Sequence, residues 1–313
     1  MNQEFDAISR LFQERVTFKH NTTSIANGDD ASVHAIPQGY ELVISTDSSV
    51  QAVHWPEDMP LHIAASRATH AALSDLAAMG AKPAWIWLAI MAESKQALSQ
   101  MSDGIVVSCK KHHIELAGGD TTRSTTNTMN ITVGGLLPAG SAMTRRAAHK
   151  HDEVWVWGNI GLSAAGLQHW LEGKQDSELV QRFQNVTPLF HEGIKLRELG
   201  VTTCIDISDG LLQDAGHIAK ASQVGIQIEI SAIKALPAYQ LLHQQFDEET
   251  CLKYMLSGGE DYALLFTANT DLHTSLKGLG AHCIGRCVQG YHVSLGHQGE
   301  ALDYHIKGYD HFG

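Results

Sequence analysis

The stretch TCIDISDGLLQDAGHIAK, residues 203–220, decides the fold of its region, because a strand-like run ends in it and a helical one begins. From Leu211 onward apolar residues recur at helical spacing, which predicts a helix. Ser208 or Asp209 is the expected N-cap, since hydroxyl and carboxylate oxygens accept the free amide N–H groups of a first turn. Capping does not account for Asp206, which we expect at the end of a buried strand. The acidic residues at this junction therefore need a second explanation.

Helix-like and strand-like segments alternate in both directions from this junction. Examples are the strand ELVIST (41–46) and the helix LHIAASRATHAALSDLAAMG (61–80). The pattern lapses into small and basic residues at PAGSAMTRRAAHKHD (138–152). The sequence therefore predicts two α+β halves, residues 1–138 and 139–313.

Composition and charge exclude several classes of protein. The formal net charge of −12 argues against a nucleic-acid-binding protein, which presents a basic surface. An anionic small substrate remains compatible with this charge if divalent cations lie between the two sets of negative groups. The longest apolar run, PAWIWLAIMA (83–92), has about half the length of a membrane-spanning helix. The N-terminal segment has no signal-peptide pattern, and the five cysteines form no CxxC pair, so we expect a cytoplasmic protein with free thiols.

Acidic residues recur beside glycines and hydroxyl groups at expected strand ends in both halves. The motifs are NGDDAS (27–32), STDSSV (45–50), AGGDTTR (117–123), IDISDG (205–210) and SGGEDY (257–262). Each motif alone fits a turn or a helix cap, and Asp75, in an Ala/Leu-rich helical run, could pair with Arg67. Repetition in both halves favours a common role. Carboxylate, hydroxyl and backbone oxygens are the ligands that Mg²⁺ prefers, and glycines let the backbone approach a phosphate, so the pattern predicts a multi-metal nucleotide site.

The common nucleotide-binding signatures are missing from the sequence. GLSAAGLQ (161–168) has the glycine spacing of a P-loop, but Leu167 and Gln168 stand where Lys and Ser/Thr are needed. No GxGxxG follows a strand, and neither HRDxxxxN nor DFG occurs. A nucleotide site in this chain must be of another kind.

Seven strings carry a resemblance that spans nearly the whole chain. They are GDDAS (28–32), ISTDSSVQAVHW (44–55), LSDLAAMGAKPAW (73–85), AGGDTTR (117–123), IDISDGLLQDAGHI (205–218), SGGEDYALLFT (257–267) and KGYDHF (307–312). In this order they resemble the thiamine-monophosphate kinase family, part of a group with aminoimidazole ribonucleotide synthetase and selenophosphate synthetase. LSDLAAMGA, SGGEDY and the terminal GYDHF are the most specific of them.

The resemblance implies ATP-dependent phosphorylation of thiamine monophosphate to thiamine diphosphate. Transfer would be direct and in line, with several Mg²⁺ ions and no phosphoenzyme. The implied fold has two α+β domains of the aminoimidazole ribonucleotide synthetase-like type. The N-terminal domain, 1–138, would bind metal and ATP and pair with that of a second subunit in a barrel-like homodimer. The C-terminal domain, 139–313, would complete the active site.

Position by position, the resemblance implies three sets of site residues. The implied metal ligands are Asp30, Ser45, Thr46, Asp47, Asp75, Asp120, Asp206 and Asp209. The implied ATP contacts are Gly119, Asp120, Arg145 and Ser208. His54 and Glu260 would contact the thiamine phosphate, with Ile306 on the thiamine side.

The chain departs from the family at four positions outside the metal set. Ala72 replaces a frequent Asn before LSD, and His112 stands where a Tyr near the adenine is frequent. Leu162 replaces a common Asp, and Ile306 replaces a Trp. These departures put individual base and thiamine contacts in question and leave the expected metal chemistry intact.

Three other functions fit the same scaffold. Selenophosphate synthesis would require a reactive Cys near the N-terminus, whereas the first cysteine is Cys109. The SGGEDY and GYDHF strings favour the thiamine branch over aminoimidazole ribonucleotide synthetase. A catalytically silent nucleotide-binding protein would have little reason to keep the whole acidic set.

Overall fold

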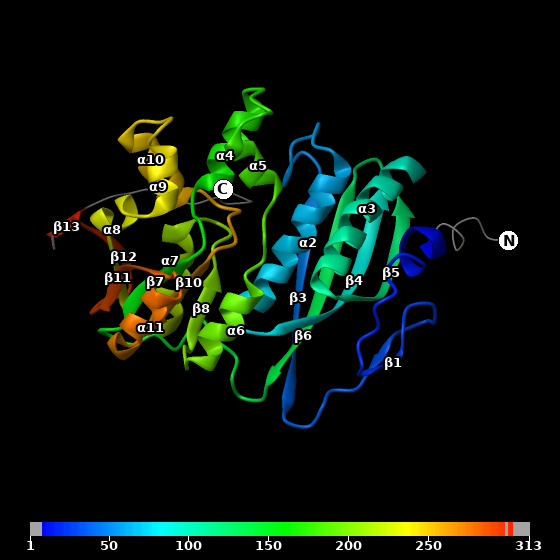
Figure 1. Cartoon of the computed structure of the whole chain (residues 1–313), viewed down its shortest axis with the longest axis horizontal. Coiled ribbons are helices and arrows are strands. Elements are labelled where there is room, and N and C mark those ends of the chain that lie inside the picture. The colour runs from blue at the N-terminus through cyan, green and yellow to red at the C-terminus, as the bar shows by residue number, and fades with distance from the viewer. Residues whose placement is uncertain (1–7, 298–299, 303–313) are drawn as a thin grey trace. The chain divides into compact units, whose positions relative to one another are not determined.

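The computed structural model describes residues 8–297 and 300–302, and its contacts divide the chain into two units (Figure 1). Unit 1 comprises Met1–Leu76 and Ala81–Gly140, and unit 2 comprises Ala77–Gly80 and Ser141–Gly313. Each unit combines a mixed sheet with helices, so the predicted α+β class is confirmed. Within the described ranges, no helix is long and apolar enough to cross a membrane.

Unit 1 is built on a four-stranded sheet. Its order is β3 (Tyr40–Val50), β6 (Thr128–Pro138), β4 (Lys82–Ala92) and β5 (Glu115–Arg123). Neighbouring strands are antiparallel except β4 and β5, which run parallel. The α-helix α3 (Lys95–His112) joins these two, as a parallel pair requires a long crossover.

The helices α2 (Leu61–Ala78) and α3 cover one face of this sheet (Figure 1). A Cβ atom on Gly135 of β6 would lie 3.2 Å from Leu76 Cδ1 of α2. A Cβ atom on Gly104 of α3 would lie 2.0 Å from the carbonyl oxygen of His62 in α2, so only glycine allows this helix–helix approach. The first described residues of unit 1 form η1 (Ser9–Gln13), β1 (Thr23–Ile25) and β2 (Val33–His34).

Unit 2 contains a seven-stranded sheet with helices. The strand order is β13 (Glu300–Leu302), β12 (Val293–His297), β9 (Gly225–Glu229), β11 (His282–Val288), β7 (Glu153–Trp157), β10 (Leu264–Ala268) and β8 (Thr203–Asp206). The β12–β9 pair is parallel and the other pairs are antiparallel. The helices are α4 (Leu162–Leu171), α5 (Glu178–Gln184), α6 (Phe190–Glu198), α7 (Leu211–Ser222), α8 (Ile230–Lys234), α9 (Pro237–Leu242), α10 (Glu248–Ser257), η2 (Thr270–Leu272) and α11 (His273–Gly278).

The strand–helix junction at 203–220 lies in the core of unit 2. All residues of β8 and β10 are buried, although β8 includes Thr203 and Asp206 and only β10 reads as a nearly continuous apolar run. Ile205, Ile207 and Leu211 belong to one buried apolar cluster. The last residue of the strand and the first of the helix are thus held in place by burial on both sides of the connecting loop.

Three details of the sequence interpretation were wrong. Residues 45–47 lie in the middle of a strand instead of at its end, because β3 pairs with β6 through Val50. Asp120 likewise lies within β5. The N-cap of α7 is Gly210, without a side-chain cap, and neither Ser208 nor Asp209 has that role. Instead, the carboxylate of Asp214, in the first turn of the helix, accepts amides of the loop before it.

Candidate active site

Three of the predicted metal ligands meet between β3 and α2 in unit 1. Successive residues of a strand point to opposite faces, so Ser45 and Asp47 share one face, which α2 covers. The Ser45 hydroxyl donates a hydrogen bond to a carboxylate oxygen of Asp75. Burial, followed by the negative charge of Asp75, raises the pKa of Asp47 to about 6. The two carboxylates repel each other, and a cation between them would relieve that repulsion.

Thr46 and Asp120 lie on the opposite face of the same sheet. The Thr46 hydroxyl shares a 2.8 Å hydrogen bond with the hydroxyl of Thr132 in β6. Asp120 is in register with Ala89, Asn130 and then Ser48, and directly opposed residues share a face. The set predicted from the sequence is therefore divided between two faces, and Thr46 could join Asp47 at one ion only through its main-chain oxygen.

Asp30 lies in the connection between β1 and β2, where it is exposed. Two tryptophans of β4 hold this hairpin on the sheet: Trp85 Nε1 donates to Thr23 Oγ1 at 2.9 Å, and Trp87 Nε1 donates to Ser32 Oγ at 3.0 Å. Trp87 is opposite Thr132 in the register, so the hairpin lies on the face that carries Thr46 and Asp120. Within unit 1, Asp30 thus belongs with Asp120 and not with the Asp47 cluster.

A buried carboxylate that the sequence analysis missed fastens the same hairpin. Glu115, at the start of β5, is 2% exposed. Its Oε2 accepts hydrogen bonds from the Thr23 hydroxyl at 2.6 Å and from the amide of His20 at 2.7 Å. Two hydrogen bonds to one buried carboxylate therefore join the strand that carries Asp120 to the hairpin that carries Asp30 and to the segment just before it.

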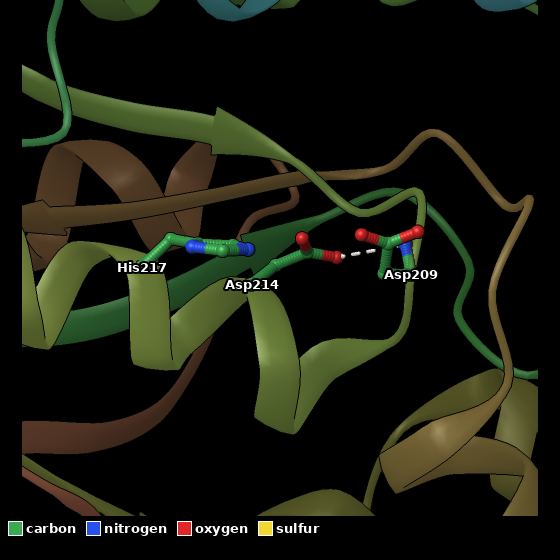
Figure 2. Close-up of side chains that lie close together, drawn as sticks. All are labelled: Asp209, Asp214 and His217. Carbon is green, nitrogen blue, oxygen red and sulfur yellow. Dashed lines mark hydrogen bonds between the residues drawn. The ribbon is translucent and has the colours of Figure 1, made fainter. Parts of the chain in front are cut away.

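In unit 2, Asp206 ends β8 and is 5% exposed, as the sequence predicted for a carboxylate on a buried strand. The loop after it is held by Asp214, in the first turn of α7 (Figure 2). Asp214 Oδ2 accepts the amide N–H groups of Ser208, Asp209 and Gly210 at 3.1, 3.1 and 3.2 Å. Burial, followed by the charge of Asp209, raises the pKa of Asp214 to about 7, and the three amide donors oppose this rise.

Asp214 also belongs to a compact group of possible metal ligands. Asp209, Asp214 and His217 each offer a ligand atom within 4.8 Å of the others (Figure 2). It is the one such group of three or more His, Cys, Asp or Glu residues in the part of the chain that the structure describes. Of its members only Asp209 was predicted, because Asp214 and His217 read as ordinary polar positions of an amphipathic helix.

The SGGEDY segment packs against the Asp209 loop through the main chain. The amide of Glu260 donates to the carbonyl of Ser208 at 2.8 Å, and that of Tyr262 donates to Ile207 at 2.9 Å. Glu260 and Tyr262 have φ values of +63° and +54°, a left-handed conformation that non-glycine residues adopt at an energetic cost. A Cβ atom on Gly259 would lie 2.2 Å from the carbonyl oxygen of Ser208, so this approach requires glycine.

Asp261 stabilises a helix start. Its carboxylate accepts the amide N–H groups of Gly161 at 2.5 Å and Ser163 at 2.8 Å, at the N-terminus of α4. Negative charge is favourable at this end of a helix. The SGGEDY segment thus places one acidic side chain on α4 and leaves Glu260, which is partly exposed, beside the Asp209 loop.

The other predicted residues are placed as follows. The carbonyl of Arg145 accepts a hydrogen bond from Ser222 at the C-terminal end of α7, whereas Ser208 precedes its N-terminal end. A helix of 12 residues spans about 18 Å, so the main chains of these two expected ATP contacts are well separated. His54 Nδ1 accepts the amide of Val50 at 3.0 Å, which leaves the proton of the neutral ring on Nε2.

Three remaining positions concern the nucleotide and the thiamine. A Cβ atom on Gly119 would lie 2.3 Å from the carbonyl of Leu88, so β5 can approach β4 there only with glycine. His112 Nε2 lies 3.2 Å from His70 Nε2, which engages this side chain between α3 and α2. Ile306 and the KGYDHF string lie outside the described residues.

Comparison with known proteins identifies relatives over the full length of the chain. Residues 28–137 match the family described as AIR synthase related protein, N-terminal domain. The thiamine-monophosphate kinase of Escherichia coli (strain K12) is 37% identical over 99% of this chain and 98% of its own. That of Salmonella typhimurium is 35% identical with the same coverage.

Solved structures agree with these sequence matches. The crystal structure of thiamine-monophosphate kinase from Stenotrophomonas maltophilia K279a has a TM-score of 0.83 and 31% identity, covering 95% of this chain and 97% of that one. AaThiL complexed with AMPPCP and TMP has a TM-score of 0.79 and 24% identity, covering 99% and 96%. At 24% identity, the second match shows similarity of the fold alone.

Proposed function

The chain belongs to the thiamine-monophosphate kinase family, and from this premise we infer that it transfers the γ-phosphoryl group of ATP to thiamine monophosphate. The products are thiamine diphosphate and ADP. The observation that carries this conclusion is identity of 35–37% over 99% of the chain to kinases of that name. The acidic set in both units is the chemistry that such a transfer requires.

Transfer between two phosphates is mainly a problem of charge and position. At 4 Å, two like unit charges repel by roughly 4 kcal/mol at an effective dielectric constant near 20. There is little covalent chemistry for a side chain to perform, because the acceptor is already an anion. The chain's own task is therefore to hold both substrates in line and to supply ligands for cations.

The residues present fit Mg²⁺, the cation that we propose. Ser45, Asp47 and Asp75 offer only oxygen donors, and burial together with the negative charge of Asp75 raises the pKa of Asp47. We propose as ligands the full set of Asp30, Ser45, Thr46, Asp47, Asp75, Asp120, Asp206 and Asp209. Bound Mg²⁺ supplies neutralisation of the phosphate charges.

The remaining predicted residues are proposed as substrate contacts. Gly119, Asp120, Arg145 and Ser208 would serve ATP, and His54, Glu260 and Ile306 the thiamine phosphate. The close main-chain packing of Gly259 on Ser208 supports a link between the two sets, since Glu260 and Ser208 then move together. We propose that residues 1–138 bind metal and ATP and form the dimer, and that residues 139–313 complete the site.

A homodimer is part of the proposal. The face of the unit 1 sheet opposite α2 exposes three apolar side chains of the edge strand β3: Tyr40 at 47%, Leu42 at 40% and Ile44 at 58%. Such a patch favours association, and pairing with a second copy through this face agrees with the barrel-like dimer that the resemblance implies. Light scattering that gave a fully active monomer at micromolar concentration would contradict it. The five free thiols support the cytoplasmic location expected from the sequence.

The decisive experiment measures products. The protein is incubated with Mg-ATP and thiamine monophosphate, and thiamine diphosphate and ADP are separated by chromatography. Equal amounts of both products are expected. Thiamine without its phosphate serves as the control, because the proposed cations need an acceptor phosphate to bind. Formation of thiamine monophosphate from thiamine would argue against this arrangement, and absence of thiamine diphosphate would refute the function.

A further inference from the structure

The loop between β8 and α7 is organised around one side chain to which the sequence analysis gave no role. Asp214 is 2% exposed, and a single oxygen, Oδ2, accepts three consecutive amides, those of Ser208, Asp209 and Gly210. Figure 2 shows its carboxylate directed along the helix toward Asp209. These amides precede the first turn of α7, so Asp214 holds, from within the helix, the loop that leads into it.

The main chain of this loop is also constrained from other directions. Gly210 has a φ of +114°, and a Cβ atom there would lie 2.8 Å from the main chain of Ser257. Ser208 accepts the amide of Glu260 on the other side. A small rotation of the loop would therefore displace Ser208, Asp209 and the Glu260 main chain together.

The geometry separates the roles of Asp214 and Asp209. Three N–H donors occupy Oδ2 of Asp214, which leaves that oxygen little capacity for an ion. Asp209 is half-buried, and its own Oδ2 accepts only a side-chain amide, that of Gln213 at 3.0 Å, among the hydrogen bonds between described residues. A side-chain amide can turn away when a ligand binds, whereas three main-chain amides cannot.

We propose that Asp214 is a positioning residue for the phosphoryl transfer: its carboxylate oxygen fixes the main chain of Ser208–Gly210 and so sets the directions of the Ser208 and Asp209 side chains. This inference rests on the proposed function for its kinetic part. Asp214 acts through these neighbours and does not bind the cation.

Two substitutions at position 214 test whether Asp214 holds the main chain of residues 208–210 or binds the cation. Asp214→Asn keeps an acceptor oxygen and removes the charge, whereas Asp214→Ala removes the oxygen. Amide hydrogen exchange at 208–210 and the steady-state constants for both substrates are measured for each. For Asp214→Ala we expect exchange at least about tenfold faster and a kcat/KM lower by about 10², as for a displaced catalytic group. Asp214→Asn should restore exchange to near the wild-type rate and keep activity within about tenfold, because a neutral oxygen still accepts hydrogen bonds.

Two further variants serve as references. Asp209→Asn, at a proposed ligand, should lose activity by about 10²–10³ with wild-type exchange at 208–210. Asp247→Ala removes the N-cap of α10, where Asp247 accepts the amide of Thr250 at 2.8 Å. It should lower the melting temperature and leave the kinetics and the exchange at 208–210 unchanged.

Each outcome decides between the roles. If Asp214→Asn loses as much activity as Asp209→Asn while exchange stays normal, Asp214 is a ligand and the proposal fails. Wild-type exchange and kinetics in Asp214→Ala would also overturn it. If Asp214→Ala does not fold, the comparison of the two Asn variants decides alone. If the wild-type protein forms no thiamine diphosphate, the proposed function fails, and the exchange data still test the anchor.

Discussion

The two units keep their buried carboxylates in different ways. In unit 1, Asp47 and Asp75 approach each other, and burial with the neighbouring charge raises the pKa of Asp47 to about 6. In unit 2, Asp214 is more deeply buried than either, but three main-chain amides donate to it. We propose that a cation from solution stabilises the first arrangement, whereas main-chain donors of the protein stabilise the second. On our proposals, acidic residues that look alike in the sequence thus divide into cation ligands and residues that hold the main chain.

The largest expected effect is a loss of kcat/KM on replacing a proposed cation ligand, and it should be similar in the two units. Asp47→Asn in unit 1 and Asp209→Asn in unit 2 should each lower kcat/KM by about 10²–10³, a loss of roughly 3–4 kcal/mol of transition-state stabilisation. Excess Mg²⁺ should restore part of the activity if affinity is the defect. The double variant should be little worse than the poorer single one, as for groups that act as a unit. Rates measured against Mg²⁺ concentration check this, and near wild-type activity in either single variant would remove that residue from the site.

The second prediction concerns stability and sharpens the difference between the units. The folded pKa of Asp47 lies above its usual 3.8, so the protonated form is favoured by folding. Its contribution to stability is present below about pH 4 and is lost as the pH rises through about 6. For metal-free protein we expect this loss to be about 2–3 kcal/mol, since one pKa unit corresponds to about 1.4 kcal/mol.

Urea unfolding with a chelator, at a series of pH values, measures this loss. Asp47→Asn should remove it, while the contribution of Asp214, whose pKa is also raised, stays in both proteins. Added Mg²⁺ at neutral pH should stabilise the wild type more than the variant. If the unfolding free energies of the two proteins depended on pH in the same way, the ionisation of Asp47 would not destabilise the folded state.

The third prediction tests whether the SGGEDY segment contains one ligand and one structural residue. Glu260→Gln should raise KM for thiamine monophosphate by about tenfold, the equivalent of one lost charged contact, and leave KM for ATP nearly unchanged. Asp261→Asn, next to it, should instead lower the melting temperature, because Asp261 holds the start of α4. Unchanged KM values for both substrates in Glu260→Gln would assign Glu260 to the turn alone.

The smallest effects separate the two faces of β3. Ser45→Ala should lower kcat/KM by about fivefold, since it removes a hydroxyl that contacts Asp75 and is worth about 1 kcal/mol. Thr46→Val, one residue along, should stay within about twofold, because its hydroxyl is engaged with Thr132 on the other face. The two variants are compared in parallel kinetic assays. A larger loss of kcat/KM for Thr46→Val than for Ser45→Ala would mean that the face of β3 that carries Thr46 contributes more to catalysis than the face that carries Ser45.

The sequence predicted the course of the chain better than the contacts of its side chains. The junction at 203–220 was predicted correctly, because β8 ends at Asp206 and α7 begins at Leu211 where the apolar spacing changes. The length of β3 was not, since STDSSV contains small polar residues that fit a strand or a turn equally well. Pairing with β6, a segment about 85 residues away, decides it: Ser48 and Asn130 are 82 apart and Thr46 and Thr132 are 86 apart.

The two missed carboxylates show the same limit. Glu115 contacts Thr23 and His20, 92 and 95 residues earlier in the chain, and no local pattern encodes such a contact. Asp214 lies only four to six residues from the amides that it accepts, but its role depends on a loop conformation that Ser257 and Glu260 help to set. Side-chain roles that depend on tertiary contacts cannot be predicted from spacing alone.

The indole contacts of the β1–β2 hairpin give the protein two built-in spectroscopic reporters. Trp85 and Trp87 donate their N–H groups to hydroxyls on either side of Asp30, so we expect these protons to exchange with solvent faster when the hairpin leaves the sheet. Trp55 and Trp155 bury the same atom without a partner among the described residues, which distinguishes their NMR signals from the hydrogen-bonded pair. The rate at which the Asp30 loop opens, with and without nucleotide, can thus be read from indole N–H resonances without labelling the chain at any new position.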